Sequence, residues 1–266
     1  MRGFDGLGRR KVVLGMVHLG ALPGTPFYEE GSDEATFEKA LADATALAEG
    51  GADGCLVQTV DRVYSPRDEA DPARVAAVAC IVRAIARATP PDFQVGVQIM
   101  RNALKASLAV ARVCGGSYVR CGALVGATLT AHGLVEANPL DVLQYRALLG
   151  AGHVGLVAEV DSMHFKWLGG KPVGAVARAA RGAGAAAVSL GDPDEDRTLA
   201  MIREVRQTAP DLPIVLAGYT THANAARLLA EADGAFVGTC LERDGWGGRV
   251  DVARVRAYVE IVRALG

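Results

Sequence analysis

Two carboxylates and a histidine stand close together after one apolar run of the sequence. Glu159 and Asp161 are separated by a single residue, and His164 follows shortly after them. Because side chains alternate along a strand, we expect both carboxylates to lie on the same face. Two like charges held together raise the pKa of one group, which suits a general acid or base. We therefore predict that Asp161 or Glu159 transfers protons and that His164 assists.

Arginine, histidine and amide side chains follow other apolar runs and could hold a ligand. We expect Arg101 to contact the reacting part of the ligand, because arginine stabilises developing negative charge. The side chains expected to bind the substrate are His18, Gln58, Gln98, Asn102, Arg120 and Asp192. The alternative is a structural ion pair, in which one of the two carboxylates only anchors Arg101 or Arg120.

A second kind of chemistry is indicated by glycine and threonine at the ends of two neighbouring apolar runs. The two segments are Gly218-Tyr219-Thr220 and Gly238-Thr239. Glycine lets backbone amides approach an anion closely, and the N-terminus of a following helix adds a favourable dipole. We predict a phosphate site formed by Gly218, Tyr219, Thr220, Gly238 and Thr239. Two ordinary strand-to-helix turns are the alternative interpretation.

These side chains fit the making or breaking of a C–N or C–C bond at a phosphosugar, as in a lyase or a glycosyl-transfer reaction. No cofactor is predicted. Two histidines and two carboxylates could bind a divalent metal, so a metal-dependent reaction is not excluded. No H-E-x-x-H pattern occurs, however. The sequence contains no P-loop and no G-x-S-x-G motif, which argues against a nucleoside triphosphatase or a serine hydrolase.

If strands and helices alternate along the chain, all of these residues lie at the same end of one parallel sheet, because each of them follows a strand. Glycine turns recur at residues 50–51, 115–116, 182–184 and 234, where each ends an amphipathic stretch and starts an apolar run. We predict a single (β/α)8 barrel, one domain over residues 1–266, with its active site at the carboxyl ends of the strands. A doubly wound open sheet is the alternative, but the G-x-G-x-x-G fingerprint is absent. The predicted strands are 12–17, 54–60, 95–100, 117–121, 154–160, 186–190, 214–217 and 235–237.

Composition limits the partners and the compartment. The net charge of −2 gives no reason to expect a nucleic acid as partner. The apolar runs are too short and too interrupted to span a membrane, and the start of the sequence lacks a secretory apolar segment. The five cysteines have no close pairing or metal-type spacing, which is typical of free thiols in a reducing cytosol. We expect a cytoplasmic protein, and the high apolar fraction favours a homo-oligomer.

Several motifs of the chain resemble those of the BtpA/SgcQ family of barrels. The most specific is G-M-V-H-L-G-A-L-P-G at residues 15–24, and others lie at residues 96–102, 133–136 and 232–239. The resemblance implies a barrel with a phosphosugar or nucleotide-type ligand. Because the family name comes from a role in photosystem I accumulation, it also implies an alternative function as a non-catalytic assembly or regulatory factor.

The chain departs from the family pattern at the predicted mouth of the barrel. Gln58 follows the second strand where the family has an acidic residue, and Gln98 replaces an asparagine. The stretch that ends in His164 keeps the histidine of the family but not the preceding lysine, and Glu242 replaces another lysine. These differences indicate a specialised member, either with new chemistry or with a lost active site.

Overall fold

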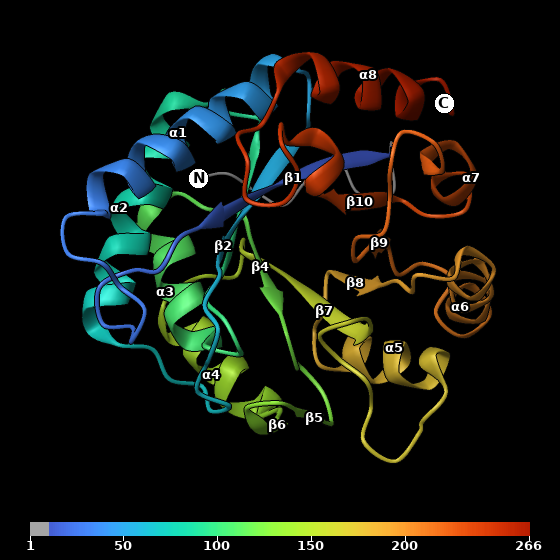
Figure 1. Cartoon of the computed structure of the whole chain (residues 1–266). Coiled ribbons are helices and arrows are strands. Elements are labelled where there is room, and N and C mark those ends of the chain that lie inside the picture. Colours follow the sequence, from blue (N-terminus) through green and yellow to red (C-terminus); the bar gives the residue numbers. More distant parts are fainter. Residues whose placement is uncertain (1–10) are drawn as a thin grey trace.

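Eight strands form a closed barrel in the computed structural model, which describes residues 11–266. The strands follow the order β1-β10-β9-β8-β7-β4-β3-β2 around the barrel, so the first and last strands are neighbours (Figure 1). All pairings between them are parallel. The strands are β1 (Val12–Leu19), β2 (Gly54–Thr59), β3 (Gln94–Gln98), β4 (Tyr118–Cys121), β7 (Gly155–Asp161), β8 (Ala187–Leu190), β9 (Ile214–Leu216) and β10 (Gly234–Val237).

This architecture confirms the predicted (β/α)8 barrel. The alternative open sheet is excluded because β1 pairs with both β2 and β10, which closes the sheet on itself. Each predicted strand is present, and its ends differ from the prediction by one or two residues at most.

The helices form a layer outside the barrel (Figure 1). Three of them begin at residue types that favour a helix start: Asp71, Asn138 and Asp251 each cap a helix by accepting a hydrogen bond from a backbone amide of its first turn. Among residues 11–266, no helix combines the length and the apolar character needed to cross a membrane. The helices are α1 (Asp33–Glu49), α2 (Pro72–Ala88), α3 (Leu104–Cys114), α4 (Pro139–Leu148), α5 (Val173–Gly182), α6 (Glu195–Thr208), α7 (Ala225–Leu229) and α8 (Val252–Arg263), with a 3₁₀ turn η1 at Thr239–Leu241.

An antiparallel hairpin lies outside the barrel, in a stretch where no strand was predicted. Its strands are β5 (Ala127–Thr130) and β6 (Gly133–Glu136), and the hairpin connects β4 to α4. Leu129 and Leu134 are paired across the hairpin and are both exposed. Residues 127–130 alternate in character too briefly to separate a strand from a loop, so the pattern gave no clear signal.

The interior of the barrel is filled by side chains, as is usual for this fold. Tyr118 from β4 crosses the interior and donates a hydrogen bond of 2.8 Å to the carbonyl of Cys55 on β2. Gly96 on β3 leaves room for the Tyr118 ring, because a Cβ at that position would lie 2.1 Å from the ring carbon Cζ. The filled interior confines ligand space to the ends of the barrel. The buried side chains that fill the interior are those of Val12, Leu14, Met16, Leu56, Tyr118, Val157, Ala187, Val215 and Phe236.

Candidate functional site

A pocket of about 460 Å³ opens at the carboxyl ends of the strands. Its wall contains all five residues of the predicted phosphate site, which are Gly218, Tyr219, Thr220, Gly238 and Thr239. Four other predicted site residues, His18, Gln58, Arg120 and His164, also line it. The pocket therefore brings together side chains from opposite sides of the barrel, and we call it the mouth pocket.

The two predicted phosphate loops lie side by side in this pocket. The Cys240 thiol contacts the carbonyl of Thr220 at 3.5 Å, which links η1 to the loop after β9. Gly218 has φ of 117°, and the left-handed backbone continues at Tyr219 with φ of 61°. Within residues 11–266, no hydrogen-bond acceptor is recorded for the amides of Tyr219, Thr220 and Thr239. Such a group of amides can hold the oxygens of a bound anion.

Arg120 and Glu159 form a buried ion pair beneath the pocket. Nε of Arg120 lies 2.9 Å from Oε1 of Glu159, and both side chains are almost fully buried. The other carboxylate oxygen of Glu159 accepts a hydrogen bond from Ser162. The guanidinium lies over the ring of Phe236, and its Nη2 has no hydrogen-bond partner in the described part of the chain. Arg120 therefore keeps donor capacity for a ligand, while Glu159 serves as its counter-ion.

His164 is set up as a neutral hydrogen-bond donor. Nη1 of Arg101 lies 3.0 Å from Nδ1 of His164, and arginine can only donate, so Nδ1 accepts and Nε2 carries the proton. Burial lowers the pKa of His164 to about 4, and the charges of Arg120 and Arg101 act in the same direction against the carboxylate of Glu159. At neutral pH this imidazole suits donation to a ligand oxygen rather than the assistance in proton transfer that we expected from the sequence.

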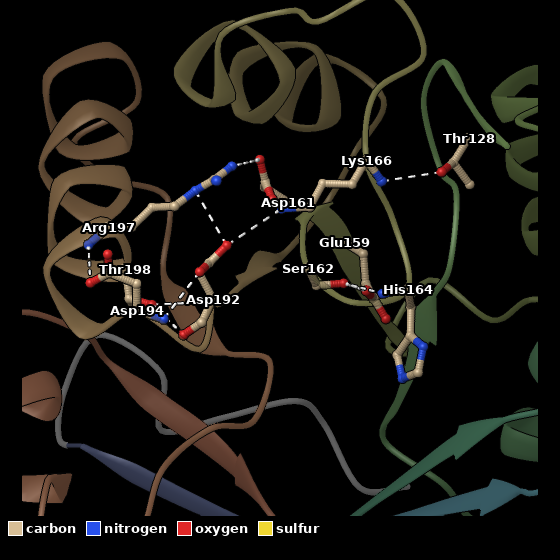
Figure 2. A network of polar contacts seen from close by, with 10 residues as sticks. All are labelled: Thr128, Glu159, Asp161, Ser162, His164, Lys166, Asp192, Asp194, Arg197 and Thr198. Carbon is tan, nitrogen blue, oxygen red and sulfur yellow. Dashed lines mark hydrogen bonds and ion pairs between the residues drawn. The ribbon is translucent and has the colours of Figure 1, made fainter. Parts of the chain in front are cut away.

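Glu159 and Asp161 do not form the close pair of carboxylates that the sequence predicts. The register between β7 and β8 shifts between these two residues, which breaks the regular alternation of side chains. Figure 2 shows Glu159 beside Ser162 and His164, whereas Asp161 is directed toward Arg197. The Glu159 side chain is fully buried, and that of Asp161 is 20% exposed. The two carboxylates therefore have separate partners and separate environments.

Asp161 belongs to a cluster of charges at the rim of the mouth (Figure 2). Lys166 forms an ion pair with Asp161 and lies 3.7 Å from Asp192, and Arg197 lies 3.3 Å from Asp192. Sequence reasoning missed Lys166 and Arg197, although Lys166 follows His164 by only two positions. Both cations are more than half exposed, so these ion pairs are weak contributors to stability.

Three residues predicted to contact the ligand are used in contacts within the protein. Asn102 exchanges two hydrogen bonds with the backbone of Ala123, at 3.1 and 2.8 Å. Gln98 is buried and accepts a hydrogen bond of 3.0 Å from Gln58, which itself lines the mouth pocket. Arg101 stands behind His164 and outside the pocket lining. Asn102 and Gln98 therefore position neighbouring groups, and Arg101 reaches a ligand only through His164.

A histidine and a buried glutamate meet where β1 and β10 lie side by side. Nδ1 of His18 is 3.4 Å from Oε1 of Glu242, and the other oxygen of Glu242 accepts a hydrogen bond of 2.9 Å from the amide of Gly247. The ring of Trp246 lies 5.8 Å from that of His18. Sequence reasoning noted Glu242 only as a departure from the family pattern and missed Trp246. A glycine on each side of Trp246 was the available signal of a constrained loop.

The described part of the chain does not gather the usual ligands of a metal ion. Within residues 11–266, no group of three or more histidine, cysteine, aspartate or glutamate side chains is placed to hold one. The carboxylates of Asp161 and Asp192 face Lys166 and Arg197 instead.

Fold and pocket together define a (β/α)8 barrel with a pocket at the carboxyl ends of its strands. The BtpA family model matches residues 9–264, and the chain belongs to this family. The photosystem I biogenesis protein BtpA of Synechocystis sp. is 30% identical over 93% of this chain and 86% of its own. The putative sgc region protein SgcQ of Escherichia coli is 25% identical, with 96% of each chain covered.

A solved structure with the same fold is the thiamine phosphate pyrophosphorylase of Pyrococcus furiosus. It superposes with a TM-score of 0.56 at 17% identity and covers 96% of both chains. At that identity the likeness establishes the shared barrel fold.

Proposed function

We propose that this protein is an enzyme that acts on a phosphorylated small molecule, either a phosphosugar or a nucleotide-like compound. The observation that carries the proposal is the composition of the mouth pocket. Amides of Tyr219 and Thr239, for which no acceptor is recorded among residues 11–266, line the pocket together with Arg120. Backbone amides at a glycine turn suit phosphate oxygens, and arginine adds a donor with a permanent charge. The pyrophosphorylase that shares this fold is named for a phosphorylated compound, which agrees with this class of ligand.

The proposed chemistry is the making or breaking of a C–N or C–C bond, as in a lyase or a glycosyl transferase. With the phosphate at Tyr219 and Thr239, the rest of the ligand extends across the mouth toward His164 and Arg120. Both side chains are donors and can stabilise negative charge that develops on a reacting atom. Asp161 at the rim is the proposed general acid or base, because its side chain is partly exposed whereas Glu159 is fully buried against Arg120. No redox cofactor is needed for this chemistry.

The phosphate site is tested by adding a methyl group at a single glycine. Gly218→Ala places a Cβ in the pocket and strains a backbone with φ of 117°, so we expect at least a tenfold loss of affinity for ribose 5-phosphate by calorimetry. Gly150→Ala is the matched control, since Gly150 also has positive φ and open space but lies at the end of α4. Equal affinity in the Gly218 variant and the parent would place the site elsewhere.

Turnover is tested at Asp161. A screen of phosphosugars and nucleotides identifies the substrate, and Asp161→Asn should then lower turnover by about 100-fold while phosphate affinity is kept. Asp211→Asn is the control, because Asp211 is exposed and pairs only with Arg181 among the described residues. Full activity of the Asp161 variant would remove this residue from the chemistry.

The second candidate is a non-catalytic ligand-binding factor that acts in assembly or regulation. Two observations favour it: the buried carboxylate Glu159 is occupied by Arg120, and a relative is named for photosystem I biogenesis. This candidate predicts binding of a phosphorylated ligand that depends on Gly218, with no product formed from any compound of the screen.

A further inference from the structure

A second pocket adjoins the mouth pocket on the side of β1 and α1. Its volume is about 360 Å³, and His18 and Trp246 line both pockets. A ligand held at the phosphate loops can therefore continue past these two rings into the second space, which we call the side pocket.

Trp246 is fixed at this boundary although its side chain is exposed. Its loop is closed by a bridge between Glu242 and Val250 and by a hydrogen bond of 2.8 Å from the amide of Arg243 to the carbonyl of Arg249. The neighbouring amide of Gly247 is bonded to the buried carboxylate of Glu242. The indole is 64% exposed, so one face of a large aromatic ring stays available at a fixed position.

The walls of the side pocket differ in character. Its apolar lining residues are Leu19, Ala35 and Val60. Polar groups come from α1 and the residue before it: the Ser32 side chain makes no capping hydrogen bond, and Lys39 pairs with Asp43 but stays one quarter exposed. Thr36 stands one helical turn after Ser32 and lines the same wall.

The lining of the side pocket favours binding of a planar ring over binding of a sugar. A sugar carries hydroxyl groups around its whole edge, and those that meet Leu19, Ala35 or Val60 would lose their hydrogen bonds to water without replacement. A heteroaromatic ring places its polar atoms along part of its edge and offers an apolar face for stacking on an indole. The polar side chains of Ser32, Thr36 and Lys39 in the lining suit that edge.

We infer that the side pocket binds a planar nitrogen-containing ring that is joined to the phosphorylated part of the ligand in the mouth pocket. This inference rests on the proposed function, because the phosphate anchors the ligand at Tyr219 and Thr239. The ligand is then a nucleotide-like compound, and the bond between its two halves passes His18.

The test compares ligands with and without a ring. Ribose 5-phosphate, AMP, GMP, CMP and UMP are titrated into the protein by calorimetry, and we expect at least one nucleotide to bind about tenfold or more tightly than ribose 5-phosphate. Trp246→Ala should remove this advantage, so that the nucleotide then binds no more tightly than ribose 5-phosphate does to the same variant. Leu168→Ala, which also removes an exposed apolar side chain, is the control and should change neither affinity.

A direct readout comes from fluorescence, because the chain has only two tryptophans. In a Trp167→Phe variant the emission arises from Trp246 alone, and the tight-binding nucleotide should quench it while ribose 5-phosphate does not. If ribose 5-phosphate binds, but no nucleotide binds more tightly or quenches Trp246, the inference fails and the proposed function stands. If none of the five compounds binds, both fail.

Discussion

Among the single residues of the site, Arg120 and Glu159 are under the strongest constraint. Both are buried, and each is the nearest opposite charge of the other. Glu159→Gln leaves the guanidinium without its counter-ion, and we expect a loss of about 3–5 kcal/mol in the free energy of unfolding, measured with urea. The double variant Arg120→Met, Glu159→Gln should recover most of this loss, because no buried charge is left unpaired.

The surface pair Arg203–Glu231 is the control for that measurement. Its atoms approach to 2.6 Å, closer than those of the buried pair, but the Arg203 side chain is 62% exposed. Arg203→Met should therefore change stability little, since water compensates both charges. Equal effects at both pairs would show that burial does not set the energy of the Arg120–Glu159 contact.

His164 makes stability depend on pH. Its pKa is about 4 in the folded protein and about 6.5 in an unfolded chain, so between these values the unfolded state binds more protons. Stability from this group is present above pH 6.5 and declines as the pH falls toward 4, by up to about 3 kcal/mol. Urea unfolding at pH 7 and pH 4.5 measures the decline. His164→Asn should have a smaller pH dependence than the parent, and an identical dependence in both proteins would contradict the assignment.

At the scale of elements, β3 and β4 depend on one glycine. Tyr118 occupies the space beside Gly96, and both are fully buried. Gly96→Ala forces the ring to move, and we expect a loss of about 1–3 kcal/mol in unfolding free energy. Gly182→Ala in α5 is the control: its new Cβ meets nothing within 4 Å, and the change should be neutral or stabilising. A stable Gly96 variant would mean that the barrel interior is less tightly filled than described.

Elements with local signals could be predicted from the sequence, and elements set by distant contacts could not. The helix caps at Asp71 and Asn138 and the glycine turn at Gly218 follow from residue types in a short window. The register shift before Asp161 has no such signal, and a single extra residue is enough to separate it from Glu159. The partners of Asp161 likewise depend on where the loop with Lys166 returns to the barrel.

On the scale of the whole molecule, closure of the barrel assembles the site. The contact of His18 with Glu242 joins residues 224 positions apart, and it forms because β1 and β10 are neighbours. The general location of the site was predictable from the fold, since all strand ends meet in one mouth. Which side chains touch each other there was not, because it depends on loops such as the one with Trp246. A homo-oligomer, expected from the apolar composition, stays a prediction.

The buried Arg120–Glu159 pair also limits which residues can be substituted in this family during evolution. Loss of either partner alone leaves a stranded charge, so a lineage that stopped needing catalysis would still tend to retain both. If a relative contains both residues, this shows that its fold needs the ion pair, and it does not show that the relative is active. The amides of Tyr219 and Thr239 have no acceptor recorded among residues 11–266. If they bind phosphate as we propose, an insertion near them would remove binding without leaving a buried charge unpaired. On this proposal, a member that loses its function should change first at the loops after β9 and β10 and last at the Arg120–Glu159 pair.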